Sequence, residues 1–177
     1  MIGRKATTSP LVEEFRICNT PVIGAYIFWR FAKTFVQEAK KLNKVSNPHL
    51  LLFSFVAAIF SDRRILDELK SRRSISSFRR YLTGAKKGVL FDGIHIRVKE
   101  MLPYTLSALD IAYSCGILRM NRDDGTIEPV AVRAKRGTPE LVSESISDDS
   151  LLAETLGRWF AKYGSPVEVA KKLEVVL

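Results

Sequence analysis

The stretch that decides the fold is GVLFDGIHIRVKEMLPYTLSALDIAYSCGILRMNRDDGTIEPVAV, residues 88–132. Apolar residues recur at helical spacing until Pro103, which breaks the pattern and starts a second helix that Gly116 ends. Two short apolar runs then flank Asp124-Gly125, a strong hairpin-turn signal. The order of helix, break, helix and hairpin predicts a helix-turn-helix with a wing.

The segments on either side of this block are predicted to be helical. Thr20-Pro21 supplies an N-cap residue followed by proline at the first helical position, and this helix should run to about Lys41. Residues 50–60 are apolar on all sides except for one serine, which indicates a helix buried in the fold or at an obligate interface. We therefore predict a mainly α fold: a helical bundle with a winged-helix-like block and one small β-hairpin wing.

The chain divides into segments of different composition. We expect residues 1–14 to form a flexible arm and residues 15–177 to form a single mainly helical domain. Within that domain, residues 88–132 are the winged-helix-like block. Residues 137–147 are predicted to be an acidic linker, and residues 148–177 to form the C-terminal helices.

Composition limits the classes of protein that the chain can represent. A length of 177 residues with 46% hydrophobic residues suits a folded globular protein. The net charge of +9 favours nucleic acid, an acidic protein face or an anionic membrane as a partner, although ordinary solubility explains it equally well. The N-terminal residues contain no apolar signal-peptide core, and the longest apolar runs are too short to span a bilayer. We expect a cytoplasmic protein without membrane contact.

Catalytic and metal-binding patterns are missing from the sequence. The two cysteines, Cys18 and Cys115, are far apart and have no metal-spaced neighbours, and Cys115 is expected to be buried in an apolar helix. No Gly-rich phosphate loop is present, and neither histidine has a nucleophile at a recognisable spacing. We therefore expect no enzymatic activity, no cofactor and no metal. The alternative is a divergent active site that uses His95 and Asp92, which would share one helix face.

Basic residues cluster in two places that could follow a phosphate backbone. The predicted second helix, residues 103–118, contains no Lys, Arg, Asn or Gln, the residues that usually read base edges. Any DNA contact should therefore come from the block 70–87 or from the wing. The opposing interpretation is that these cations only complement helix ends. The candidate nucleic-acid-binding residues are Lys70, Arg72, Arg73, Arg79, Arg80, Lys86 and Lys87 in the block, and Arg119, Arg122, Arg133, Lys135 and Arg136 in or near the wing.

Large apolar side chains are numerous for so small a helical bundle, which indicates an interface with other proteins. Aromatic anchors commonly dominate such interfaces. The candidate partner-binding residues are Phe28, Trp29 and Phe31 in the first helix, and Leu156, Trp159 and Phe160 near the C-terminus. The alternative is that these side chains close the core.

Several segments together resemble a known family. They are NTPVIGA at 19–25 leading into WRF at 29–31, NP at 47–48 before the apolar helix, KEMLPYTLSAL at 99–109, and LGRWFA at 156–161. These segments are similar to the small middle component of three-component ABC ATPase systems, the group that includes Lamassu-type anti-phage operons. The resemblance implies an adaptor that bridges an SMC/Rad50-like ABC ATPase and an effector protein, often a nuclease, with DNA sensed by the ATPase.

A second function class is a stand-alone winged-helix regulator that binds DNA. The neutral second helix argues against it, because a recognition helix usually carries residues that read bases or phosphates. Binding of DNA by the purified chain alone at physiological salt would distinguish this class from an adaptor.

Overall fold

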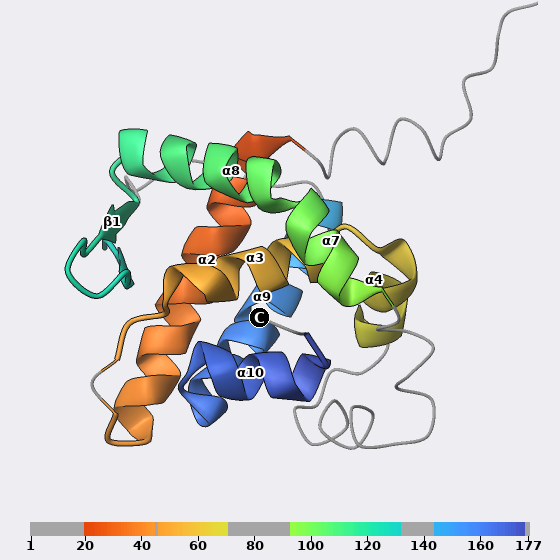
Figure 1. Ribbon diagram of the computed structural model, residues 1–177. Helices are drawn as coiled ribbons and strands as arrows, with labels where there is room; N and C mark the ends of the chain where they lie inside the picture. Colours follow the sequence, from red (N-terminus) through yellow and green to blue (C-terminus); the bar gives the residue numbers. More distant parts are fainter. Residues whose placement is uncertain (1–19, 45, 71–92, 132–143, 176–177) are drawn as a thin grey trace, which may run out of the picture.

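The computed structural model describes residues 20–44, 46–70, 93–131 and 144–175 (Figure 1). These ranges contain seven α-helices and one two-stranded antiparallel sheet, which confirms the predicted mainly α fold. The elements are α2 (Pro21–Lys41), α3 (Leu50–Phe60), α4 (Arg63–Lys70), α7 (Ile94–Glu100), α8 (Leu102–Ser114), β1 (Leu118–Met120), β2 (Ile127–Pro129), α9 (Glu144–Tyr163) and α10 (Pro166–Leu173).

Helix α2 lies at the centre of the core, and nine of its 21 residues are buried. The helix begins after Thr20, whose backbone is extended, with Pro21 in the first turn. The rings of Phe28 and Phe31 pack edge to face on Phe53 of α3, with centroid distances of 5.4 and 5.3 Å. Helix α3 is buried along most of its length, so its all-round apolar sequence is explained by packing inside the fold.

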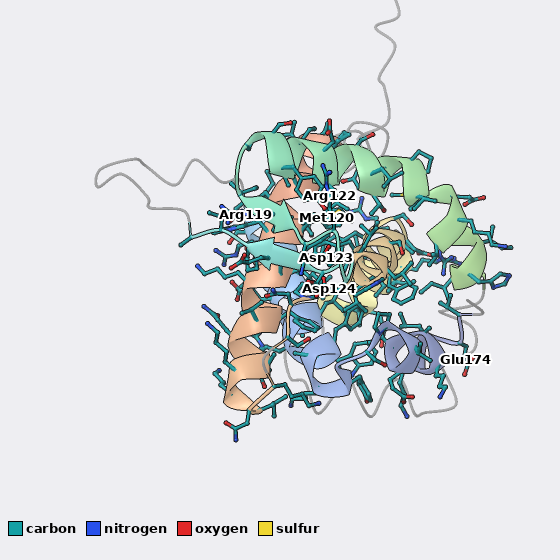
Figure 2. All side chains as sticks on the ribbon, turned by 60° about the vertical axis from the view of Figure 1, so that its left-hand side comes forward. Arg119, Met120, Arg122, Asp123, Asp124 and Glu174 are labelled. Atoms are coloured by element: carbon teal, nitrogen blue, oxygen red, sulfur yellow. The ribbon has the colours of Figure 1, made fainter. Side chains whose placement is uncertain are left out.

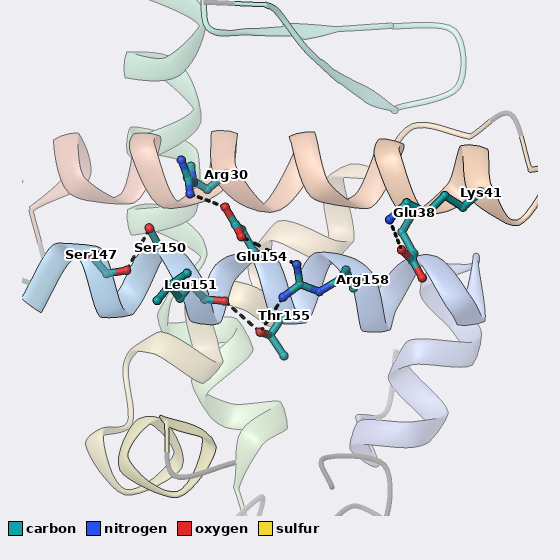
Figure 3. A network of polar contacts seen from close by, with 9 residues as sticks. All are labelled: Arg30, Glu38, Lys41, Ser147, Ser150, Leu151, Glu154, Thr155 and Arg158. Carbon is teal, nitrogen blue, oxygen red and sulfur yellow. Dashed lines mark hydrogen bonds and ion pairs between the residues drawn. The ribbon is translucent and has the colours of Figure 1, made fainter. Parts of the chain in front are cut away.

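Helix α9 lies along α2 and runs in the same direction (Figure 3). Arg30 contacts Glu154 toward one end of the pair, and Lys44 Nζ donates to the carbonyl of Lys162 at the other end, at 3.2 Å. The backbones approach closely at Gly157, where a Cβ atom would lie 2.6 Å from the carbonyl oxygen of Phe31. A glycine is therefore required where these two helices meet.

The start of α9 corrects the predicted linker. The helix begins at Glu144, so residues 144–147 of the predicted linker 137–147 are helical. Ser147 does not cap the helix, because its carbonyl accepts a hydrogen bond from the Ser150 hydroxyl inside the first turns. Asp149, further along the helix, is only 2% exposed. Acidic residues suit the first turn of a helix as well as a loop, so their charge alone could not place the boundary.

The β-hairpin is present where the Asp-Gly signal predicted it. Strands β1 and β2 pair in an antiparallel register with Arg119 opposite Glu128, and Gly125 in the turn has φ +66°. On the outer side of the hairpin, His49 forms an isolated antiparallel bridge with Thr126. The His49 ring also accepts a hydrogen bond from the Leu51 backbone, at 3.2 Å, and so caps α3. This residue therefore attaches the hairpin to the beginning of α3.

Helix α8 lies across α2 and precedes the hairpin (Figure 1). Its buried side contains Thr105, Ala108, Leu109 and Ala112, whereas Leu106 is 52% exposed. Cys115 is exposed as well, so the prediction that it is buried in an apolar helix was wrong. The cause is the close approach of α2: a Cβ atom on Gly24 would lie 3.0 Å from the Cβ of Ala108, so the small residues of α8 face α2.

Candidate protein and nucleic-acid interfaces

Five of the six predicted partner-binding side chains are in the core. Phe28, Phe31, Leu156, Trp159 and Phe160 are each at most 1% exposed. The rings of Phe31 and Phe160 meet edge to face at 5.6 Å, and Trp159 packs on Phe160 at 4.9 Å. The prediction that these side chains offer an exposed docking face was wrong, because α2 and α9 bury them against each other.

Trp29, the sixth of these residues, is half-buried and connects α2 to the end of the hairpin. Its indole Nε1 donates a hydrogen bond to the carbonyl of Val130, at 3.1 Å. The Lys33 ammonium lies 5.0 Å from the centroid of the indole ring, in cation–π contact. Trp29 is therefore in part a structural residue, and it is not fully buried.

The exposed apolar face of the described residues that sequence reasoning missed is on α8. Leu102 is 48% exposed and Leu106 is 52% exposed, and their spacing of four residues puts them on the same side of the helix. Asp110 continues this row one turn later and is the only charged residue of α8. The opposite row of small residues, including Ala108 and Ala112, is the sequence signal that could have identified the side packed on α2.

Only two of the predicted nucleic-acid-binding side chains lie among the described residues. Arg119 and Arg122 are exposed on the hairpin (Figure 2). The side chain of Lys70 and the other predicted residues lie outside the described residues: Arg72, Arg73, Arg79, Arg80, Lys86, Lys87, Arg133, Lys135 and Arg136. The described residues therefore do not test whether the two basic groups lie near each other, and the role of these groups stays a prediction.

The net charge of the described residues differs from that of the whole chain. The whole chain has 28 basic and 19 acidic residues, but the described ranges contain 16 and 15. Near the hairpin turn, Asp123 and Asp124 accompany Arg122 (Figure 2). The described residues are thus nearly neutral in net charge, and most of the net positive charge that could attract DNA belongs to other parts of the sequence.

Asp62 forms a buried ionic junction between α3, α4 and α7. Its carboxylate accepts hydrogen bonds from the backbone and side chain of Arg64, and Arg97 of α7 lies 2.9 Å from the same carboxylate. Burial alone would raise the pKa of Asp62, but the Arg64 hydrogen bonds and the charges of Arg97 and Arg64 outweigh it and hold the pKa below its usual value of 3.8. This junction fixes α7 against the start of α4.

Two further observations concern metals and membranes. No group of three or more His, Cys, Asp or Glu side chains in the described ranges is arranged to hold a metal ion. His95 is exposed on α7, and its predicted companion Asp92 lies outside the described residues. None of the described helices has the length and hydropathy needed to cross a bilayer.

Comparison with known proteins identifies the family. Neither a curated protein nor a solved structure matches the chain. The family model of the ABC-three component (ABC-3C) system Middle Component 3 matches residues 8–177, which include all the described elements. The chain therefore belongs to the Middle Component 3 family of ABC-three component systems.

Proposed function

We propose that this chain is a non-catalytic adaptor subunit that bridges an SMC-like ABC ATPase and an effector, a nuclease, in an anti-phage or anti-plasmid complex of the Lamassu type. Membership of the middle-component family supports the existence of partner proteins. The main structural support for an adaptor function is the exposed apolar row on α8, where Leu102 and Leu106 both face solvent. A pair of exposed leucines one turn apart, on a helix whose only charged residue is Asp110, suits a protein partner better than a phosphate backbone.

The position of α8 in the fold strengthens this assignment. The order of α8, hairpin and the bridge at His49 resembles that of a winged helix, in which the helix before the hairpin usually reads DNA. In this chain that helix has no basic residue, and Asp110 on its exposed side would repel phosphates. We infer that the winged-helix-like block is used for protein contact, and that any DNA contact is non-specific and made by the basic segments and the hairpin.

The experiment is co-expression of the chain with the ATPase and effector encoded in the same operon, followed by affinity purification. The variant Leu102→Asp/Leu106→Asp is expected to lose at least one partner, because two carboxylates would replace the apolar contact. The matched control is Leu151→Asp on α9, where the native leucine is 54% exposed but lies on another helix. If both variants retain both partners, α8 is not an interface. If the wild-type chain retains neither, the adaptor function is wrong.

A further inference from the structure

A continuous groove runs between α2 and the hairpin. Two hollows of about 470 and 220 Å³ lie side by side there, and both are lined by Val36 and Pro129. The larger hollow extends to Asp124 at the turn of the hairpin, and the smaller one extends to Trp29. Because two lining residues are shared, we treat the hollows as one elongated groove.

The α2 wall of this groove carries basic side chains, and the floor beside it, at Val36 and Pro129, is apolar. Trp29, Lys33, Val36 and Lys40 recur every three or four residues, so one face of α2 forms the wall. Lys33 and Lys40 are exposed, and neither forms an ion pair among the described residues. Arg30, which follows Trp29, is instead directed to Glu154 of α9. Two ammonium groups with no carboxylate partner among the described residues therefore border the apolar floor, about two helical turns apart, and that of Lys33 lies against the Trp29 ring.

The hairpin wall has the opposite charge. Asp124 and Glu128 line it, and hydrogen bonds from the Thr126 side chain and backbone hold the pKa of Asp124 below its usual value. A DNA backbone would meet these carboxylates at close range, which disfavours phosphate as the ligand. The groove suits a ligand that is negatively charged toward α2 and apolar in its centre.

Pro129 limits how a polypeptide can bind in this groove. The Ile127 N–H, on the outer edge of β2, donates to the Pro48 carbonyl at 2.9 Å. Pro129 comes two residues later on the same edge and has no N–H to offer. An added strand would therefore gain few ladder hydrogen bonds, so recognition must rely on side chains.

We propose that this groove binds an extended segment of a partner protein, with acidic side chains toward Lys33 and Lys40 and an apolar side chain on Val36 and Pro129. An extended segment turns successive side chains to opposite sides, so it can present carboxylates to α2 and neutral or basic groups to the hairpin. The proposal rests on the adaptor function and names a second contact surface, separate from the leucines of α8.

The first test is site-specific crosslinking in the purified complex. The photo-reactive residue p-benzoylphenylalanine replaces Gln37, which lines the groove and is exposed, or Lys41 as the control outside it. The Gln37 position should crosslink a partner segment that contains Asp or Glu, as mapped by mass spectrometry, and the Lys41 position should not. A crosslink to a second copy of this chain, to DNA or to a segment without acidic residues would overturn the proposal, as would no crosslink at all.

The second test measures the charge contribution. Lys33→Glu/Lys40→Glu should weaken binding of the crosslinked partner about tenfold or more, because two repulsive contacts replace two attractive ones. The control Lys41→Glu/Lys162→Glu makes the same charge change at exposed positions of α2 and α9 outside the groove. Replacing the mapped acidic residues by lysine should restore binding to the groove variant. Equal weakening by both variants, or no rescue, would contradict the proposal. A complex that is lost only in the α8 variant would leave the adaptor function intact.

Discussion

Arg30 of α2 donates a hydrogen bond to the carboxylate of Glu154 on α9, and the two residues are 124 positions apart in the chain. Arg158 also lies next to this carboxylate, one turn further along α9 (Figure 3). About a quarter of each side chain in the Arg30–Glu154 pair remains exposed, at 25% and 23%. The pair therefore fixes the axial position of α9 on α2 at the edge of an otherwise apolar interface.

Replacing Glu154 by Gln should lower the free energy of unfolding by about 1–2 kcal/mol, because two arginines lose their half-buried partner. The control Glu168→Gln breaks an exposed pair with Lys171 and should cost less than about 0.5 kcal/mol. Urea unfolding of both variants at neutral pH measures the difference. Equal losses in the two variants would show that the Arg30–Glu154 pair stabilises the fold no more than an exposed ion pair does.

Much of the secondary structure follows from local chemistry that the sequence displays. Pro21 after Thr20 predicts the start of α2. At α10 the same logic applies: Ser165 precedes Pro166, and its hydroxyl accepts the Glu168 N–H at 3.2 Å. Gly116, with φ +67°, stands after the end of α8. These signals depend only on neighbouring residues, so one sequence suffices to interpret them.

The orientation of each helix in the fold was harder to predict. The face of α8 that is buried depends on Gly24, which is more than 80 residues away and leaves space for Tyr104 and Ala108. The burial of Trp159 and Phe160 depends on the packing of α2 against α9, which no local sequence pattern predicts. The groove was missed for the same reason, because its two walls come from α2 and from the hairpin.

Gly157→Ala should destabilise the fold, although alanine normally favours a helix over glycine by about 1 kcal/mol. The added Cβ would lie 2.6 Å from the Phe31 carbonyl oxygen and 3.0 Å from the Phe35 nitrogen, both backbone atoms that cannot move separately from α2. We expect a loss of about 2 kcal/mol or more from the resulting overpacking. Thermal unfolding measures it, with Ser107→Ala at an exposed position of α8 as the control. A more stable Gly157→Ala protein would mean that α2 and α9 are further apart.

The Asp62 junction predicts a dependence of stability on pH. A carboxyl whose pKa is lowered by folding stabilises the protein above its unfolded pKa, and this contribution disappears as the pH falls through the folded pKa. The wild-type protein should therefore lose stability below about pH 4. Asp62→Asn should be less stable at neutral pH and should show a shallower decrease in acid. Urea unfolding across the acidic range checks this, and identical pH profiles for the two proteins would contradict it.

The basic block predicts the salt dependence of any DNA binding by the assembled complex. Changing Arg72, Arg73, Arg79 and Arg80 to Glu should weaken binding about equally for all DNA sequences and leave assembly intact. If each arginine contacts one phosphate, the slope of log affinity against log salt should flatten by about 3–4. The control reverses four exposed lysines of the described helices: Lys41, Lys162, Lys171 and Lys172. A block variant that fails to assemble but still binds DNA would identify the block as a protein interface.

The central claim is that this chain joins two other proteins, and an omission experiment tests it most directly. The ATPase and the effector are co-expressed with and without the chain, and the molar mass of each eluting species is measured by light scattering. We expect one species that contains all three proteins when the chain is present, and separate ATPase and effector when it is absent. Co-elution of the ATPase with the effector in the absence of the chain would contradict the claim, as would a chain that elutes as a stable monomer apart from both.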